Sequence, residues 1–200
     1  MDKMVKLPKI ISISNQKGGV GKTTTTINLS TAMVSFDKKI LIIDLDPQGN
    51  ASTGLGIDGK SRENNIYKAL TSQQDINKCI FETSIPNLKI IPSTIDLSAA
   101  EVEFSNIEKR ELILKKVINE IKEYFDYILI DCPPSLGLLT INAMSSSDEI
   151  IVPLQCEFYA LEGLSQLLKT IELIKVKLNP NLKLKGIVLT MFDSRNKLSK

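Results

Sequence analysis

The chain alternates between short apolar runs, typical of strands, and stretches in which apolar residues recur with a helical period. The runs that predict strands are Ile10–Ile13, Ile40–Ile43, Leu88–Ile91, Tyr127–Ile130, Glu149–Leu154 and Lys185–Thr190. Helices are expected from about Thr23 to Val34, over Glu111–Phe125 and from Leu164 to Leu178. Strands that are apolar on both faces and alternate with helices favour an α/β fold, with a doubly wound, mostly parallel sheet covered by helices on both faces.

The segment from Gly49 to Asn87 is the least regular part of the pattern, and we expect a loop with short helices there. With 200 residues, 42% of them hydrophobic and 24% charged, the chain has the composition of a globular protein. Its length fits a single domain over residues 1–200. The net charge of +2 is too small for nucleic-acid binding by bulk charge, so any DNA contact must come from a local patch.

The residue types that are rare or missing exclude several classes of chemistry. The sequence has no histidine, which excludes Ser-His-Asp catalysis and His-ligated metals. Its three cysteines, Cys79, Cys132 and Cys156, have no C-x-x-C spacing and fit a reducing compartment. No apolar run approaches the roughly 18 residues that span a bilayer. These features predict a cytoplasmic protein that does not use a membrane.

The most informative stretch lies between the first predicted strand and the first predicted helix. It reads Gln16-Lys17-Gly18-Gly19-Val20-Gly21-Lys22-Thr23-Thr24. Glycines allow backbone N–H groups to approach an anion without Cβ clashes, and the helix start adds its positive dipole end. Lys22 can supply a cation to the β- and γ-phosphates, and the Thr23 hydroxyl can ligate Mg²⁺. We therefore predict a phosphate-binding loop; the alternative, a glycine-rich turn without a ligand, requires the string to have arisen by chance.

The loop departs from the literal pattern G-x-x-x-x-G-K-[ST], because Gln16 stands at the first glycine position and Lys17 precedes the glycines. The string Lys17–Thr24 resembles the deviant Walker A motif of the ParA/MinD ATPases. Three longer motifs resemble the ParA (Soj-type) chromosome or plasmid partition ATPases in particular. These motifs are Ser14–Thr26, Asp44–Asn50 and Asp131–Ser135. The similarity extends from Lys9 to the end of the chain.

This resemblance implies a P-loop ATPase that hydrolyses ATP with Mg²⁺ and forms a sandwich homodimer when ATP binds. The residues to which it assigns nucleotide binding are Lys17, Gly18, Gly19, Val20, Gly21, Lys22, Thr23 and Thr24. Lys17 would cross the dimer interface to the γ-phosphate held by the partner, where a cation accelerates phosphoryl transfer. Lys17, Lys22 and Asp46 would be catalytic. The alternative for Lys17 is a solvated loop lysine.

Carboxylates follow two of the predicted strands, at the sheet edge where open α/β folds bind ligands. By the resemblance, Asp46 positions the attacking water, while Asp44 supports the magnesium shell and the geometry of its loop. Both could instead be turn or helix-cap residues. Asp131 is placed like the magnesium-associated acid of a P-loop NTPase, so the predicted metal residues are Thr23, Asp131 and Asp44. We expect Cys132 to be a small packing residue, because no histidine is present to activate it.

The resemblance also implies partners: non-specific DNA, bound by the ATP dimer, and a ParB-type adaptor protein that stimulates hydrolysis. Localisation would then be cytoplasmic and nucleoid-associated. The candidate DNA contact is Arg195, with Lys197 and Lys200 nearby, where related proteins carry a DNA-contacting arginine. A solvated chain end is the alternative.

Two other classes share the same ATP switch. A MinD-type membrane-cycling ATPase would need a C-terminal amphipathic helix, which the sequence lacks. Metabolic enzymes such as the nitrogenase iron protein or dethiobiotin synthetase would need paired interface cysteines or substrate residues that we do not find.

Full-length relatives continue past the position of Lys200 with further helices and a strand. We therefore expect C-terminal elements to be missing and apolar surface to be exposed.

Overall fold

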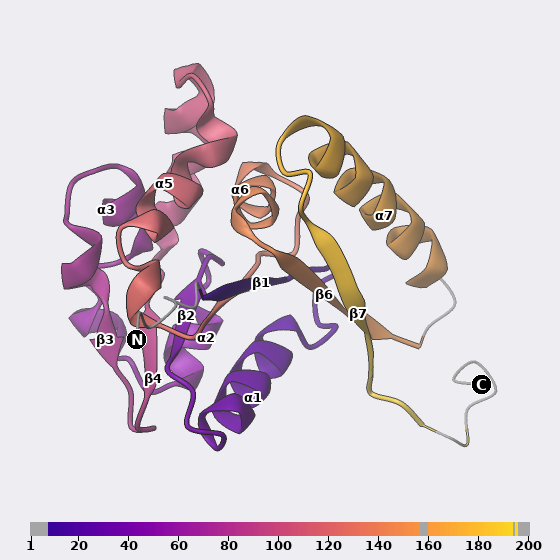
Figure 1. Cartoon of the computed structure of the whole chain (residues 1–200), viewed down its shortest axis with the longest axis horizontal. Helices are drawn as coiled ribbons and strands as arrows, with labels where there is room; N and C mark the ends of the chain where they lie inside the picture. Colours follow the sequence, from indigo (N-terminus) through magenta and orange to yellow (C-terminus); the bar gives the residue numbers. More distant parts are fainter. Residues whose placement is uncertain (1–7, 157–159, 194, 196–200) are drawn as a thin grey trace, which may run out of the picture.

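A computed structural model describes residues 8–156, 160–193 and 195, and it places a seven-stranded sheet at the centre of the molecule (Figure 1). The strand order is β3-β4-β2-β5-β1-β6-β7. All neighbouring pairs are parallel except β3 with β4, which is antiparallel. The expected α/β fold, with a doubly wound and mostly parallel sheet, is confirmed.

The strands are β1 (Lys9–Ile13), β2 (Ile40–Asp44), β3 (Phe81–Glu82), β4 (Leu88–Ile91), β5 (Tyr127–Asp131), β6 (Glu149–Gln155) and β7 (Lys183–Thr190). The α-helices are α1 (Lys22–Val34), α2 (Asn50–Gly54), α3 (Ile66–Leu70), α4 (Ala100–Glu103), α5 (Ile113–Asn119), α6 (Leu138–Ser146) and α7 (Ala160–Lys177). Short 3₁₀ turns lie between them, at Gly59–Ser61, Ile76–Cys79, Ile95–Ala99, Phe104–Asn106, Arg110–Leu112 and Lys122–Tyr124. Among these described helices, none is long and apolar enough to cross a membrane.

Helices cover both faces of the sheet (Figure 1). On one face, α1 and α2 pack on the buried side chains of β1, β2 and β4, including Ile13 and Ile42. On the other face, α3, α5 and α6 pack on β2 and β5, and α6 and α7 cover β6. Since β2 and β5 are buried on both faces, their continuous apolar runs are explained by burial rather than by amphipathic alternation.

Three elements differ from the sequence-based expectation. The predicted helix over Glu111–Phe125 is divided, because α5 ends at Asn119 and the backbone then tightens into a 3₁₀ turn at Lys122–Tyr124. Helix α6 was not predicted: it carries no charged residue and is buried almost throughout, so it shows no amphipathic period. The two-residue strand β3 was also missed, whereas the segment after Gly49 does consist of loops and short helices.

The register of the parallel strands brings the candidate residues to one edge. Asp131, at the end of β5, pairs with Ile13 of β1 on one side and with Asp44 of β2 on the other. The phosphate-loop sequence begins directly after β1, so it emerges beside both aspartates. At the far side of the sheet, β7 has apolar side chains that are 40–52% exposed, which are Leu184, Ile187, Val188 and Leu189.

Candidate functional site

The loop between β1 and α1 is held in a compact turn by its own side chains. Gly19 and Gly21 have left-handed backbone angles, with φ of 74° and 86°, which glycine adopts at little cost. The Lys22 ammonium donates a hydrogen bond to the carbonyl of Lys17 at 3.1 Å, across the mouth of the turn. Among the residues that the structure describes, no acceptor takes a hydrogen bond from the amides of Gly18 or Gly19. The loop therefore presents donors and a cation together.

The first turn of α1 is bonded to the end of β5. The Thr23 hydroxyl donates to Asp131 Oδ2 at 2.7 Å, and Thr26 Oγ1 lies 3.1 Å from Asp131 Oδ1. Burial raises the pKa of Asp131 to about 7, and the neighbouring Asp44 carboxylate adds to the rise, while the two threonine hydroxyls oppose it. A hydroxyl and a carboxylate in contact, beside the amides of a phosphate loop, form the donor set that Mg²⁺ prefers.

Lys22 is the buried cation of this site. Burial lowers its pKa below the usual lysine value, and the carboxylates of Asp131 and Asp46 partly offset that effect. An anion placed at the Gly18 and Gly19 amides would stabilise the charged form of this lysine further, because it adds a second opposite charge.

The turn after β2 fixes the other two aspartates in different ways. The Asp44 carboxylate is fully buried and accepts hydrogen bonds from the Ser52 amide at 2.8 Å, the Ser52 hydroxyl at 2.6 Å and the Asp46 amide at 3.3 Å. Burial raises the pKa of Asp44, and these donors oppose the rise. Asp46 accepts a hydrogen bond from the Gln48 amide at 3.0 Å through Oδ1. Asp44 thus points into its own loop.

A cavity of about 470 Å³ lies in front of the loop. Its lining residues are Gly18, Gly19, Gly21, Lys22, Thr23, Thr24, Asp46, Gln48, Asn50, Pro134 and Met191. Most of the predicted nucleotide-binding residues and the predicted catalytic Asp46 therefore face one space. Val20 does not line it: its side chain is buried, and its carbonyl accepts the Thr190 hydroxyl of β7 at 2.8 Å.

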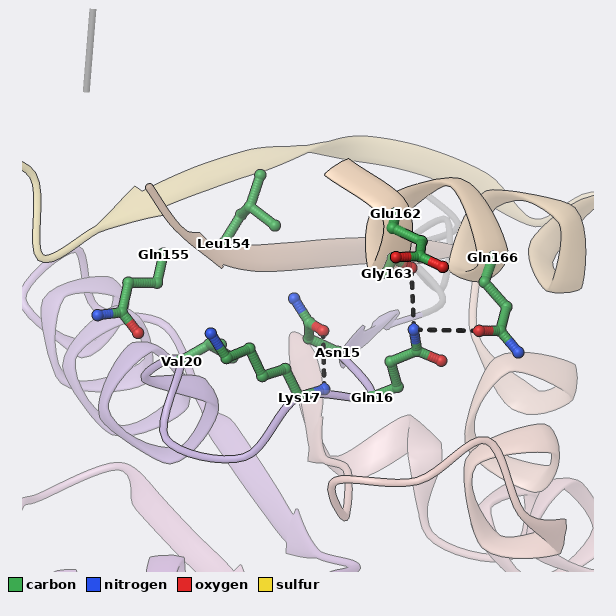
Figure 2. A pocket seen from close by; sticks show the side chains of 9 residues that line it. All are labelled: Asn15, Gln16, Lys17, Val20, Leu154, Gln155, Glu162, Gly163 and Gln166. Carbon is green, nitrogen blue, oxygen red and sulfur yellow. Dashed lines mark hydrogen bonds between the residues drawn. The ribbon is translucent and has the colours of Figure 1, made fainter. Parts of the chain in front are cut away.

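Lys17 faces a second cavity, of about 260 Å³, which shares no lining residue with the first. Figure 2 shows Lys17 and Gln16 leaving the loop in different directions within it. Gln16 Nε2 donates to the carbonyl of Gly163 at 3.2 Å and reaches Gln166 Oε1 at 3.4 Å, which ties the loop to α7. The Lys17 amide donates to Asn15 Oδ1 at 3.0 Å. The side chains of Lys17 and Lys22 thus face different cavities, although the Lys22 ammonium bonds the Lys17 carbonyl.

The remaining candidates lie away from the cavity or outside the described residues. Arg195 is exposed, and its guanidinium pairs with Asp193 at 2.8 Å. Lys197 and Lys200 lie outside the described residues. The Cys132 thiol is buried, and burial raises its pKa far above the usual thiol value, so it is an inert packing group at the end of β5.

Sequence reasoning gave no role to several residues that shape the site. Asn15 bridges the loop to β6 by donating to the carbonyl of Pro153 at 2.7 Å, and Thr26 adds the second hydroxyl at Asp131. Ser52 fixes Asp44. The signal for Thr26 was available, because it follows Thr23 by three residues and so shares its helix face. The contacts of Asn15 and Ser52 cross between distant segments and leave no local pattern.

The residues present fit a magnesium nucleotide. The Gly18 and Gly19 amides, for which residues 8–156, 160–193 and 195 offer no acceptor, suit a polyphosphate, as do the two glycines with positive φ and the buried lysine. The Thr23–Asp131 pair suits a divalent cation.

Comparison with known proteins agrees with this geometry. A family model described as an AAA domain matches residues 8–184. The chromosome partitioning protein ParA of Myxococcus xanthus is 53% identical over 94% of this chain and 66% of its own length. The sporulation initiation inhibitor protein Soj of Bacillus subtilis is 50% identical over 95% of this chain and 75% of its own length.

Among solved structures, a Mycobacterium smegmatis protein described as cobyrinic acid a,c-diamide synthase, with a bound ATP analogue and magnesium, superposes with a TM-score of 0.92. It is 36% identical, and the match covers 96% of this chain and 79% of that one. This chain thus spans about two thirds to three quarters of the length of the two curated relatives. From its sequence relatives and its fold, the chain belongs to the ParA/Soj family of partitioning ATPases.

Proposed function

We propose that this chain binds magnesium ATP, hydrolyses it to ADP and phosphate, and uses that cycle to partition DNA. The observation that carries the proposal is the contact between Thr23 and Asp131 beside the amides of Gly18 and Gly19, which have no acceptor in the described part of the chain. Thr23 and both glycines line one cavity, so a cation held at Thr23 and an anion held at the amides would share that space. The ATP-analogue and magnesium complex of the M. smegmatis relative supports the same pair of ligands.

Each of the cavity residues then has its own role in binding and hydrolysing ATP. The Gly18, Gly19 and Lys22 donors hold the phosphates, and the positive end of α1 adds to their field. Thr23 offers its hydroxyl to the metal, with Asp131 behind it. When bound, magnesium would neutralise charge on the phosphate oxygens. The Asp46 carboxylate, at the cavity wall, holds the attacking water.

Lys17 gives the site its dependence on a second copy. Its side chain faces a different cavity from Lys22, so within one chain it is placed beside the nucleotide site rather than in it. We propose that it reaches the γ-phosphate of a partner subunit in an ATP-bound homodimer, where a second cation stabilises the transition state. Hydrolysis would then require dimerisation.

Partition is favoured over the rival classes by the degree of identity. The two partitioning relatives are 53% and 50% identical to this chain, against 36% for the synthase. We accordingly propose non-specific DNA, a ParB-type adaptor and a nucleoid-associated cytoplasmic location. Arg195 is an exposed arginine available for phosphate contacts, at the expense of its pair with Asp193.

The test is ATP turnover by the protein alone, with DNA, and with DNA plus a ParB-type N-terminal peptide. We expect weak basal turnover that rises only with both additions, and ATP-dependent retention of DNA on a filter that weakens steeply with salt. Stimulation by anionic vesicles would favour the membrane-cycling class instead. Amide formation on a corrinoid acid would favour the synthase class.

The Lys17 assignment has its own experiment. Lys17→Ala should abolish turnover while largely sparing ATP binding, because Lys22 and the loop amides remain. Lys60→Ala, at an exposed position of the Gly59–Ser61 turn, is the matched control and should behave like the unaltered protein. Unchanged turnover in Lys17→Ala would refute the role.

A further inference from the structure

A buried arginine lies behind the turn that carries Asp46. Arg62 is only 8% exposed, and its guanidinium makes five hydrogen bonds. The acceptors are the carbonyl of Ile57 (3.2 Å from Nε and 2.7 Å from Nη2), the carbonyls of Gly49 and Ser93 (both 3.3 Å from Nη1) and the Thr53 hydroxyl (2.8 Å from Nη2). Among the described residues, no carboxylate forms an ion pair with it.

Burying a guanidinium without a carboxylate partner costs free energy of folding. The segments that its hydrogen bonds hold together must therefore explain why it is buried. The acceptors belong to three separate segments: α2 with the Gly49 that precedes it, the loop that follows α2, and the chain after β4. No other described side chain donates to all three segments. Because the guanidinium is planar and its donors diverge in fixed directions, it sets the spacing of these segments as a lysine could not.

The contact with Gly49 connects Arg62 to Asp46. The Gly49 amide donates to the carbonyl of Asp46 at 2.9 Å, and the Gln48 amide donates to the Asp46 carboxylate at 3.0 Å. Gly49 also approaches the guanidinium so closely that an added Cβ would lie 2.4 Å from Arg62 Nη1. The carbonyl of the last residue of this turn is therefore fixed against Arg62.

The opposite side of the same turn is fixed by Asp44. Its carboxylate holds Ser52 in the first turn of α2, and the Ser52 hydroxyl accepts the amide of Ser93 at 3.1 Å. Ser93 also offers its carbonyl to Arg62. Asp44 and Arg62 thus hold the Asp46–Gly49 turn from two sides through a shared residue, and neither of them lines the nucleotide cavity.

We propose that Arg62 is a positioning residue for hydrolysis, which fixes the Asp46–Gly49 turn and so directs the Asp46 carboxylate at the attacking water. This inference rests on the proposed function, in which Asp46 holds that water. A displacement of a water-holding group by about 1 Å costs up to about a hundredfold in rate. Nucleotide binding depends on the other loop, after β1, and should change little.

The experiment compares Arg62→Ala with Arg110→Ala as the control. Arg110 lies in the 3₁₀ turn before α5, and its guanidinium also donates to a backbone carbonyl, that of Ser105. We expect Arg62→Ala to lower kcat about tenfold to a hundredfold while the Kd for ATP stays within about twofold. Millimolar guanidinium should restore part of kcat in Arg62→Ala, and Arg62→Lys should not recover it. Arg110→Ala should match the unaltered protein.

A second readout needs no turnover. In the nucleotide-free protein, hydrogen exchange at the amides from Gly49 to Thr53 should be about tenfold faster in Arg62→Ala than in Arg110→Ala. Should Arg62→Ala fail to fold, Thr53→Val keeps the side-chain shape but removes one acceptor of Arg62, together with the bond from the Thr53 hydroxyl to the Gly49 carbonyl. A smaller loss of kcat with unchanged ATP affinity is then expected.

Two outcomes overturn the inference: a kcat in Arg62→Ala that is unchanged once corrected for the folded fraction, or a loss of ATP affinity equal to the loss of kcat. Asp46→Ala separates this failure from failure of the proposed function. If Asp46→Ala retains turnover, the role of Asp46 is wrong. If it abolishes turnover while Arg62→Ala does not reduce it, only the role of Arg62 is wrong.

Discussion

Replacing Gly49 with alanine should destabilise the protein through two separable effects. Gly49 has φ of +64°, a left-handed conformation that costs an alanine about 1–2 kcal/mol. The new Cβ would also stand 2.4 Å from Arg62 Nη1 and 3.1 Å from the carbonyl oxygen of Ser93. The guanidinium cannot simply swing away, because it is buried and bonded to three segments.

The magnitude follows from the bonds that the Cβ would break. Losing at least one charged hydrogen bond of Arg62 costs about 1.5–3 kcal/mol, so the total for Gly49→Ala is about 4 kcal/mol. For a chain of this size that loss lowers Tm by about 8–16 °C. Gly56→Ala is the matched control: its φ is +79°, but nothing lies within 4 Å of an added Cβ. It should lose only the conformational cost, about 1–2 kcal/mol.

The assay is urea unfolding of both variants, followed by Gly49→Ala in an Arg62→Ala background. With the guanidinium absent, most of the extra cost of Gly49→Ala should disappear, leaving the conformational cost and the close contact with the Ser93 carbonyl oxygen. Equal losses for the two glycine variants in the unaltered background would show that Arg62 moves aside freely, and the argument that it clamps this turn would fail.

Two further predictions concern other buried polar groups. Burial raises the pKa of Asp131 from its ordinary value of 3.8 to about 7 in the folded protein, so without nucleotide the folded state binds the extra proton and stability should rise as pH falls from 7 towards 4. The slope should flatten by up to about 1.4 kcal/mol per pH unit in Asp131→Asn, and an equal slope would contradict the assignment. Asn179→Ala should cost about 2–3 kcal/mol in urea unfolding, because the amide donates to the carbonyls of Met144 and Ser147, whereas the exposed Asn181→Ala should cost almost nothing. Similar losses for both asparagines would refute that reasoning.

Much of the fold was predictable because its signals are local. The apolar runs at β1, β2, β4, β5 and β6, and the glycine-rich string after β1, are each readable within about ten residues. Helix α6 was not predicted because burial on nearly all sides removes the amphipathic period. The start of α5 at Ile113, inside the predicted helix, is supported by a contact with a distant segment, from the Leu114 amide to Asn142 Oδ1 at 3.1 Å. Arg62 lies in the irregular segment, where the sequence holds no period, and its role comes from acceptors that are distant in the chain.

Asp44 and Asp131 show how the structure separates residues that the sequence presents as equals. Each ends a buried strand, and the two are register partners across β2 and β5. The Asp44 carboxylate accepts hydrogen bonds from two backbone amides and one hydroxyl of the segment that follows it. Backbone amides cannot rotate away without breaking the turn. Within the described residues, the hydrogen-bond donors to the Asp131 carboxylate are the side-chain hydroxyls of Thr23 and Thr26, and a hydroxyl can turn its proton elsewhere at little cost. Of the two carboxylates, Asp131 is therefore the one that can exchange its donors for a cation, and Asp44 is the one that keeps the neighbouring turn in place.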